Sequence, residues 1–168
     1  MRLRAKKAGR AALDPEAAAD PRSIRKTALE FLARRDFSAG ELERRLEERG
    51  YDAAAIVPVL QDLVAKRFLD DDRFIENFVS YHAARGQGPI RIAVELRQRS
   101  VPAEAIERHL DAIADWRERA CTARRKKFGA GVPKDFKSRA KQGRFLEYRG
   151  FSPEHIRAAL EGDVAAED

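Results

Sequence analysis

The stretch RGFSPEHIRAAL at residues 149–160 has two counterparts earlier in the chain, RGYDAAAIVPVL at 49–60 and RSVPAEAIERHL at 99–110. The three segments lie fifty residues apart, and each places an isoleucine seven residues after its arginine and a leucine four residues later. Further leucines keep the same interval, at Leu46, Leu96 and Leu146. A fixed interval of this length indicates that the chain contains three copies of one structural unit.

Each copy has the apolar spacing of helices. Ile56, Leu60 and Leu63 are separated by four and three residues, so they share one face of a helix. The alternation with a period of two that is typical of strands is missing, and clusters of β-branched residues are few. We therefore predict an all-α fold, an elongated array of three tandem three-helix repeats.

Capping residues divide each copy into helices. Short polar residues, glycine or proline mark two helix starts in every copy, at Ser38, Gly88 and Ser138 and at Asp52, Pro102 and Ser152. The predicted helices span 22–35, 38–49, 52–67, 70–85, 88–99, 102–114, 115–128, 135–149 and 152–161. Pro58 predicts a kink or a late start in the third of them. The glycines that follow Arg49 and Arg149 predict left-handed helix ends.

The predicted organisation is an arm followed by three repeats. Residues 1–21, basic and then rich in Ala, Asp and Pro, are expected to form a flexible arm. The repeats are expected at 22–69, 70–114 and 115–168, the last with a short tail. A unit of about fifty residues is marginally stable alone, and modest motion between the repeats is expected.

The composition limits the classes of function. No run of about 18 apolar residues is present, so we expect no membrane-spanning helix. The basic start MRLRAKKAGR is not followed by the apolar stretch of a secretory signal. The single cysteine, Cys121, cannot form an internal disulfide or a thiolate metal cage, which favours a reducing, cytoplasmic location.

The segment Gly86-Gln87-Gly88-Pro89 invites comparison with a phosphate-binding loop. Such a loop normally follows a strand and leads into Gly-Lys-Ser or Gly-Lys-Thr, whereas here a predicted helix precedes the glycines and a proline follows them. We interpret the segment as a turn between two helices. Arg85 and the free N–H groups of the next helix could still attract an anion there.

Side chains capable of catalysis or metal binding form no recognisable site. The side chains of Asp70–Asp72 point about 100° apart around a helix, so their carboxylates do not converge on one metal ion. We interpret this run as helix capping. His82, His109 and His155 lack partners at ligand spacing. Trp116 is expected to pack between the second and third copies. The sequence predicts no enzyme, no cofactor and no metal.

Positive charge is concentrated in the third copy. The chain carries a net charge of +6, and residues 117–149 hold twelve basic groups and three acidic ones. Such a cluster favours contact with a polyanion or an acidic protein surface, the alternative being a solvated charged helix. The predicted contact residues are Arg124, Arg125, Lys126, Lys127, Lys137, Arg139, Lys141 and Arg144, together with Arg73, Arg85, Arg91 and Arg97 in the second copy. The second-copy arginines could instead pair with acids inside the fold, such as Asp71 and Glu95.

Several ordered motifs resemble the RecX family of bacterial regulatory proteins. They are FLDDDRF at 68–74, RGQGPIRI at 85–92, ELR at 95–97, AKQ at 140–142, RFL at 144–146 and RGF at 149–151. The resemblance covers about residues 24–161. This chain departs from the family pattern at Ser100, where glycine is usual, and at Gly143, where a larger apolar residue is common.

The resemblance implies a regulator of the RecA recombinase. Members of this family are similar in having tandem three-helix repeats and in lacking enzymatic activity. They lie along the groove of a RecA–DNA filament. They restrain its ATP hydrolysis, strand exchange and co-protease action in DNA recombination, DNA repair and the SOS response. We therefore expect a cytoplasmic monomer whose partner is the RecA filament, with contacts to single- and double-stranded DNA. The alternative is a helical DNA-binding protein that acts through phosphate contacts without RecA.

Overall fold

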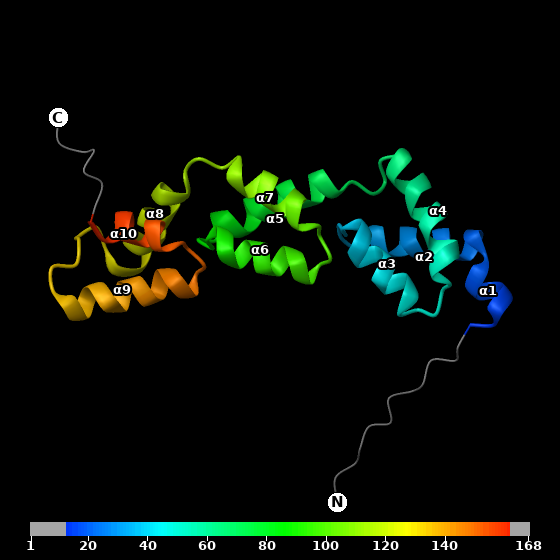
Figure 1. Ribbon diagram of the computed structural model, residues 1–168, viewed down its shortest axis with the longest axis horizontal. Helices are drawn as coiled ribbons and strands as arrows, with labels where there is room; N and C mark the ends of the chain where they lie inside the picture. The colour runs from blue at the N-terminus through cyan, green and yellow to red at the C-terminus, as the bar shows by residue number, and fades with distance from the viewer. Residues whose placement is uncertain (1–12, 162–168) are drawn as a thin grey trace, which may run out of the picture. The chain divides into compact units, whose positions relative to one another are not determined.

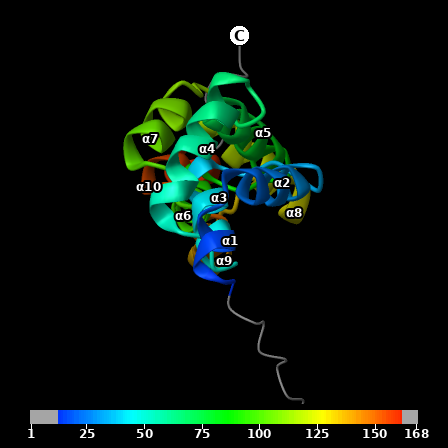
Figure 2. The same cartoon turned by 90° about the vertical axis from the view of Figure 1, so that its right-hand side faces the viewer.

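The computed structural model describes residues 13–161, and all regular elements in that part of the chain are α-helices (Figure 1 and Figure 2). The prediction of an all-α fold is confirmed. The helices are α1 (Pro15–Ala19), α2 (Pro21–Leu32), α3 (Ala39–Glu47), α4 (Ala53–Ala65), α5 (Asp71–Ala84), α6 (Pro89–Gln98), α7 (Ala103–Asp111), α8 (Trp116–Phe128), α9 (Phe136–Tyr148) and α10 (Pro153–Glu161). The nine predicted helices correspond to α2–α10, with ends that differ by at most three residues.

The short helix α1 is an addition to the predicted elements. Residues 15–19 belong to the segment for which a flexible arm was expected, but they are helical because the side chain of Asp14 accepts a hydrogen bond from the N–H of Ala17 at 2.8 Å. Asp20 then caps α2, accepting from the N–H groups of Arg22 and Ser23. The rest of the predicted arm, residues 1–12, lies outside the described residues.

Most of the predicted helix starts are observed, with two corrections. Four predicted starts are N-caps, at Ser38, Gly88, Asp52 and Pro102. At the start of α10, the hydroxyl oxygen of Ser152 accepts a hydrogen bond from the N–H of His155. Helix α9 begins before Ser138, because Asp135 caps it and accepts from the N–H of Ser138 at 2.8 Å. Helix α4 begins at Ala53 and continues through Pro58, so the predicted alternative of a late helix start is wrong.

The repeated helix ends adopt the left-handed conformation that the sequence predicts. Gly50 and Gly150 have φ angles of 90° and 86°. Ser100 occupies the equivalent position in the second repeat with a φ of 58°, although its side chain disfavours this region. The backbone geometry of this turn is therefore the same in all three repeats, even where glycine is missing.

The chain divides into two compact units, with the boundary in the sequence between Leu69 and Asp70. The first unit contains α1–α4, with a core that includes Ile24 and Leu63. The second unit contains α5–α10, and its two repeats share one core, shown by Leu96 from one repeat and Leu146 from the other. The two repeats of the second unit thus depend on each other for burial of their apolar side chains.

Trp116 contributes to the shared core of the second unit. Its side chain is 6% exposed, and its indole N–H donates to the carbonyl oxygen of Leu110 at 3.0 Å. The predicted packing of Trp116 between the second and third repeats is confirmed. Its ring is therefore not offered to solvent for stacking on a base.

The segment Gly86–Pro89 is a turn between α5 and α6, as predicted. Its amides bind protein rather than an anion: the N–H of Gly88 donates to the carbonyl oxygen of Arg149 at 2.8 Å, and the N–H of Ile90 donates to that of Gly150 at 3.0 Å. The start of α6 is consequently bonded to the turn between α9 and α10. These donors do not form the anion site that the sequence analysis allowed.

Candidate cationic interface

Helix α9 exposes a stripe of basic side chains. Lys137, Lys141, Arg144 and Tyr148 are all exposed, and at about 100° per residue they fall within an arc of about 60° around the helix. Leu146 lies on the opposite face in the core. We call these four residues the α9 stripe. Lys137, Lys141 and Arg144, all predicted contact residues, therefore share one solvent-facing side of α9.

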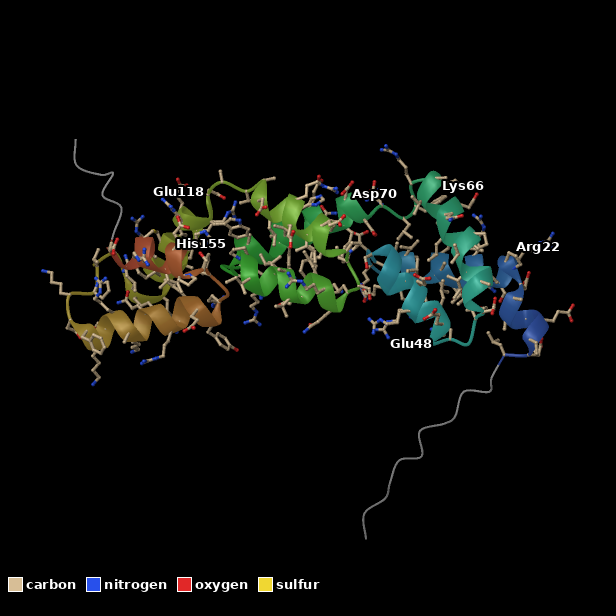
Figure 3. The ribbon with its side chains drawn as sticks, in the orientation of Figure 1. Arg22, Glu48, Lys66, Asp70, Glu118 and His155 are labelled. Atoms are coloured by element: carbon tan, nitrogen blue, oxygen red, sulfur yellow. The ribbon has the colours of Figure 1, made fainter. Side chains whose placement is uncertain are left out.

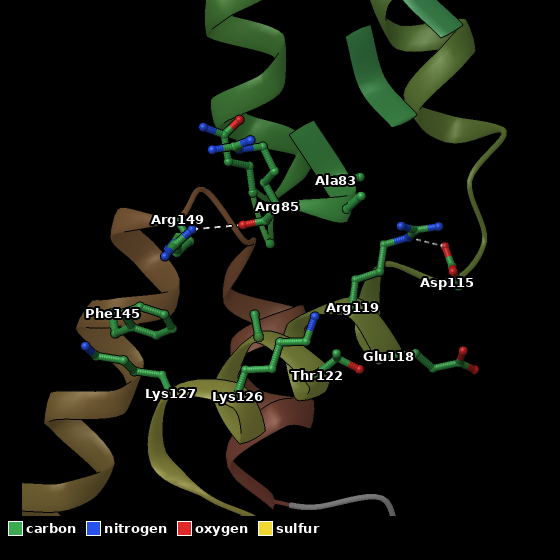
Figure 4. A pocket seen from close by; sticks show the side chains of 14 residues that line it. Ala83, Arg85, Asp115, Glu118, Arg119, Thr122, Lys126, Lys127, Phe145 and Arg149 are labelled. Atoms are coloured by element: carbon green, nitrogen blue, oxygen red, sulfur yellow. Dashed lines mark hydrogen bonds and ion pairs between the residues drawn. The ribbon is translucent and has the colours of Figure 1, made fainter. Parts of the chain in front are cut away.

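A cleft of about 840 Å³ is bounded by the end of α5, by α8 and by α9 (Figure 4). Five basic side chains line it, which are Arg85, Arg119, Lys126, Lys127 and Arg149. Only three of the five are among the predicted contact residues. We call this hollow the cationic cleft. It brings together cations from both repeats of the second unit.

Arg149 is held in the cleft by two contacts. One Nη donates to the backbone oxygen of Arg85 at 3.0 Å, drawn as a dashed line in Figure 4. The guanidinium carbon also lies 5.2 Å from the ring centroid of Phe145. A guanidinium that is bonded on one edge and placed over an aromatic ring has few alternative positions. Its remaining donors are thus oriented before any partner arrives.

Acidic side chains line the opposite end of the same cleft. Asp115 accepts from the Nε of Arg119 at 2.7 Å. Glu118 lines the cleft as well and is exposed on α8 (Figure 3). The cleft therefore has a cationic end and an end where acids lie beside Arg119, whereas all the charged residues of the α9 stripe are basic.

Arg124 is not a surface residue, contrary to its selection as a contact residue. Its side chain is 2% exposed, and its two Nη atoms donate to the carbonyl oxygens of Gly131 at 2.7 Å and Ala130 at 3.1 Å. One Nη also lies 3.4 Å from the amide oxygen of Gln142, while the Nε has no hydrogen-bond partner among the described atoms. Arg124 closes the loop between α8 and α9 from inside the fold.

The other predicted residues of the third repeat differ in exposure. Arg125, Lys126 and Lys127 are exposed at the end of α8. Arg139 is half-buried, and one of its Nη atoms donates to the carbonyl oxygen of Leu160 at 3.3 Å. Arg139 therefore links α9 to α10, and the exposed cations remain the candidates for contact.

The second-repeat arginines divide into structural and exposed groups. Arg91 donates to Glu95 at 3.0 Å, and this hydrogen bond raises the pKa of Arg91. The predicted alternative of pairing inside the fold thus holds for Arg91. Arg73 and Arg97 are exposed on α5 and α6 and do not line the cleft, so only Arg85 joins the third-repeat cations there.

The remaining reactive side chains are held within the helical packing. His82 is hydrogen-bonded to Gln87 at 2.6 Å, and its ring stacks on Phe78. Cys121 is buried in the core of the second unit. Within residues 13–161, no three His, Cys, Asp or Glu side chains are grouped so that they could hold a metal ion.

Comparisons with known proteins agree with the three-repeat organisation. The models of the first, second and third three-helix domains of RecX match residues 25–63, 70–110 and 115–160. The chain belongs to the RecX family. The resemblance drawn from its sequence motifs is confirmed, and so is the set of three three-helix units.

Individual RecX proteins match most of the chain. The regulatory protein RecX of Halorhodospira halophila is 45% identical over 145 residues, which is 86% of this chain and 90% of that protein. RecX of Pseudomonas savastanoi is 41% identical over 143 residues, which is 84% of this chain and 92% of the relative. Both relatives carry the name regulatory protein RecX.

Solved structures show the same fold at lower identity. The crystal structure of RecX from Lactobacillus salivarius matches with a TM-score of 0.74 at 18% identity, covering 86% of this chain and 96% of that one. A second RecX crystal structure matches with a TM-score of 0.70 at 19% identity, covering 89% and 79%. Among the described helices of this RecX-family chain, none has the length and apolarity needed to cross a membrane.

Two cleft residues of this RecX-family chain were missed in the sequence. Arg119 shares a face of α8 with Ala123 and Lys126, because four and three residues separate them, so helical spacing alone could have grouped it with the predicted cations. Arg149 was noticed only as the recurring arginine of the repeat. Its place in the cleft depends on the contact between the turns of two repeats, which the sequence does not display.

Proposed function

We propose that this protein binds the RecA recombinase and its filaments on DNA, and that it inhibits or modulates their recombinase, ATPase and co-protease activities in DNA recombination and repair. Membership of a family of regulatory proteins supports the proposal. The structural observation that carries it is the α9 stripe, in which Lys137, Lys141 and Arg144 are exposed on one face.

The physical basis is charge contact without a chemical reaction. A nucleoprotein filament is a polyanion, and exposed lysine and arginine side chains bind its phosphates with release of counterions. Arginine can also form two parallel hydrogen bonds with a phosphate or a carboxylate, as the guanidinium of Arg144 would. The protein proposed here is a cytoplasmic monomer that needs no cofactor or metal and that acts by occupying the filament.

A titration of RecA tests this proposal. The wild-type protein is added to RecA on single-stranded DNA at two salt concentrations, and ATP hydrolysis is followed. Substoichiometric protein is expected to lower the rate, and Lys137→Glu/Lys141→Glu is expected to require about tenfold more protein, a loss of about 1.4 kcal/mol. A rate that stays unchanged at equimolar wild-type protein contradicts the proposal.

The first unit supplies a matched control. Arg22→Glu/Lys26→Glu makes the same change in charge on α2, where both side chains are exposed. This variant is expected to inhibit RecA like the wild-type protein, since its changes lie outside the stripe. Equal losses in the two variants would show that net charge, rather than the stripe, determines the effect.

The alternative function is DNA binding through phosphates without RecA. The α9 stripe favours it, because each of its three charged side chains is basic and suits a phosphate. The affinity for DNA alone would then fall with salt, with a slope of about 0.7–0.9 per phosphate contacted. Inhibition of RecA by a protein that shows no affinity for free DNA at low salt would exclude this alternative.

A further inference from the structure

One end of the cationic cleft is basic, and the other end holds the acids Asp115 and Glu118 beside Arg119. Figure 4 shows Lys127 and Arg149 gathered around Phe145 on one side, with Asp115 and Glu118 on the other side. The end of α5 also reaches the cleft, and the last carbonyl groups of a helix carry partial negative charge. A ligand that fits this cleft must combine negative groups at one end with hydrogen-bond donors or positive charge at the other.

The cationic end suits carboxylates. Lys126 and Lys127 are exposed and able to follow a partner, while Arg149 is already oriented by its hydrogen bond to the backbone oxygen of Arg85. An oriented guanidinium loses less conformational entropy when it binds a carboxylate through two parallel bonds. Two mobile cations beside one fixed cation can thus receive two or three acidic side chains.

The interior of the cleft also has an apolar component. Ala83 and Ala123 line it as buried side chains, and the half-buried ring of Phe145 forms part of its wall. Methylene groups and small apolar side chains of a peptide can be buried against these residues. A volume of about 840 Å³ accommodates several peptide side chains.

A nucleic-acid strand fits this cleft less well than it fits the α9 stripe. Its phosphates repeat without interruption, so a strand lying along the cleft would bring negative charge against Asp115 and Glu118. The stripe presents no acid within its arc, since Glu147 lies about 90° from its centre by helical rotation. The two surfaces therefore differ in the ligand that their charges match.

We propose that the cationic cleft binds an acidic segment of a protein partner, with the carboxylates of that segment on Lys126, Lys127 and Arg149 and its amide donors or basic end at Asp115 and Glu118. This inference rests on the proposed function, in which the chain acts on a protein–DNA filament. It divides the interface: the cleft contacts protein, and the α9 stripe contacts phosphates.

Two fluorescent probes and two matched variants test the division. The probes are a short Glu- and Ala-containing peptide and a short oligothymidylate, and binding to the full-length protein is measured by anisotropy at low salt. Lys126→Gln/Lys127→Gln is expected to weaken peptide binding about tenfold and to leave oligothymidylate binding nearly unchanged. Lys137→Gln/Lys141→Gln, which removes the same charge from the stripe, is expected to do the reverse.

Each result supports or overturns the inference. The inference is overturned if the wild-type protein does not bind the acidic peptide. It is also overturned if both variants lose the same affinity for the peptide, or if the cleft variant loses as much affinity for oligothymidylate as for the peptide. Circular dichroism checks that both variants are folded. The RecA ATPase titration is read separately: peptide binding without inhibition rejects the proposed function alone, and inhibition without peptide binding rejects the cleft assignment alone.

Discussion

Gly88 and Gly150 lie against each other at the junction of the second and third repeats. A β-carbon on Gly88 would lie 2.4 Å from the carbonyl oxygen of Gly150, which is closer than any real contact of that kind. We therefore expect Gly88→Ala to force the two turns apart and to strain the hydrogen bond from Gly88 to Arg149. The free energy of unfolding should fall by about 3 kcal/mol in chemical denaturation.

Gly131→Ala is the control for this substitution. A β-carbon at Gly131 would meet no atom within 4 Å, and no positive φ is found there. Its stability is expected to stay within about 0.5 kcal/mol of wild type. If Gly88→Ala behaved like Gly131→Ala, the close approach of the two turns would not exist in solution.

Ser100 holds a left-handed conformation that costs a residue with a side chain about 1–2 kcal/mol. Ser100→Gly removes this strain, while the greater freedom of glycine in the unfolded chain offsets about 0.5–1 kcal/mol of the gain. We expect a net increase in the free energy of unfolding of about 0.5–1 kcal/mol, measured by denaturation. Ser80→Gly, within α5, should be destabilising by about 0.5 kcal/mol; a loss of stability in Ser100→Gly would contradict the strain.

The helices could be predicted from the sequence because their signals are local. The repeat interval, the caps at Ser38 and Asp52, and the apolar spacing around Leu60 are all properties of neighbouring residues, so they determine α3 and α4 without knowledge of the fold. Helix α1 was missed because its five residues carry no apolar periodicity, and its first turn depends on local bonds to Asp14, from the N–H of Ala17 to the side chain and from the N–H of Ala18 to the backbone oxygen.

Gly143 lies inside α9, where glycine is unfavourable for a helix. A β-carbon there would lie 3.6 Å from the Cδ1 of Leu160 and 3.8 Å from the Cγ2 of Ile156, which are ordinary contacts. Gly143→Ala is therefore expected to raise the free energy of unfolding by about 1 kcal/mol. A decrease would show that α9 and α10 are packed more tightly than these distances indicate.

Arg124 stabilises the loop between α8 and α9 through the carbonyl groups of Ala130 and Gly131. Arg124→Met keeps a long side chain in this buried position but removes two hydrogen bonds from a charged donor to the loop, so we expect the free energy of unfolding to fall by about 2 kcal/mol. Lys126→Met, on the exposed side of α8, should change it by less than about 0.5 kcal/mol. Loss of RecA inhibition by Arg124→Met without loss of stability would instead assign Arg124 to the interface.

The candidate interface was less predictable than the fold for a physical reason. A run of four cations, 124–127, looks uniform in sequence, yet successive side chains point about 100° apart around a helix and so cannot all face solvent. Ala120 and Cys121 lie one turn before Arg124 and are buried, so their apolar character was the signal that Arg124 faces inward. Charge alone does not reveal which cations serve the fold.

His155 couples the stability of the third repeat to pH. Its Nδ1 accepts from the N–H of Ser152 at 3.4 Å at the start of α10, and its ring edge faces Phe151. Burial lowers the pKa of His155 below its ordinary value of 6.5; the nearby Glu154 acts in the opposite direction, and Arg117 adds to the lowering. A protonated ring could no longer accept the hydrogen bond from Ser152.

The sign of the pH dependence follows from this lowered pKa. As the pH falls below 6.5, His155 in the unfolded chain takes up a proton before His155 in the folded protein does, so the stability falls until the pH reaches the lower folded pKa. His155→Gln keeps an acceptor but does not titrate. Wild type should therefore lose stability relative to this variant between about pH 7.5 and pH 5.5, as measured by denaturation. Carboxyl groups that titrate in both proteins, such as Glu154, largely cancel in that difference. The buried, hydrogen-bonded position of His155 would be contradicted by either of two results. The two stability curves could run parallel, or the wild type could become more stable relative to the variant as the pH falls.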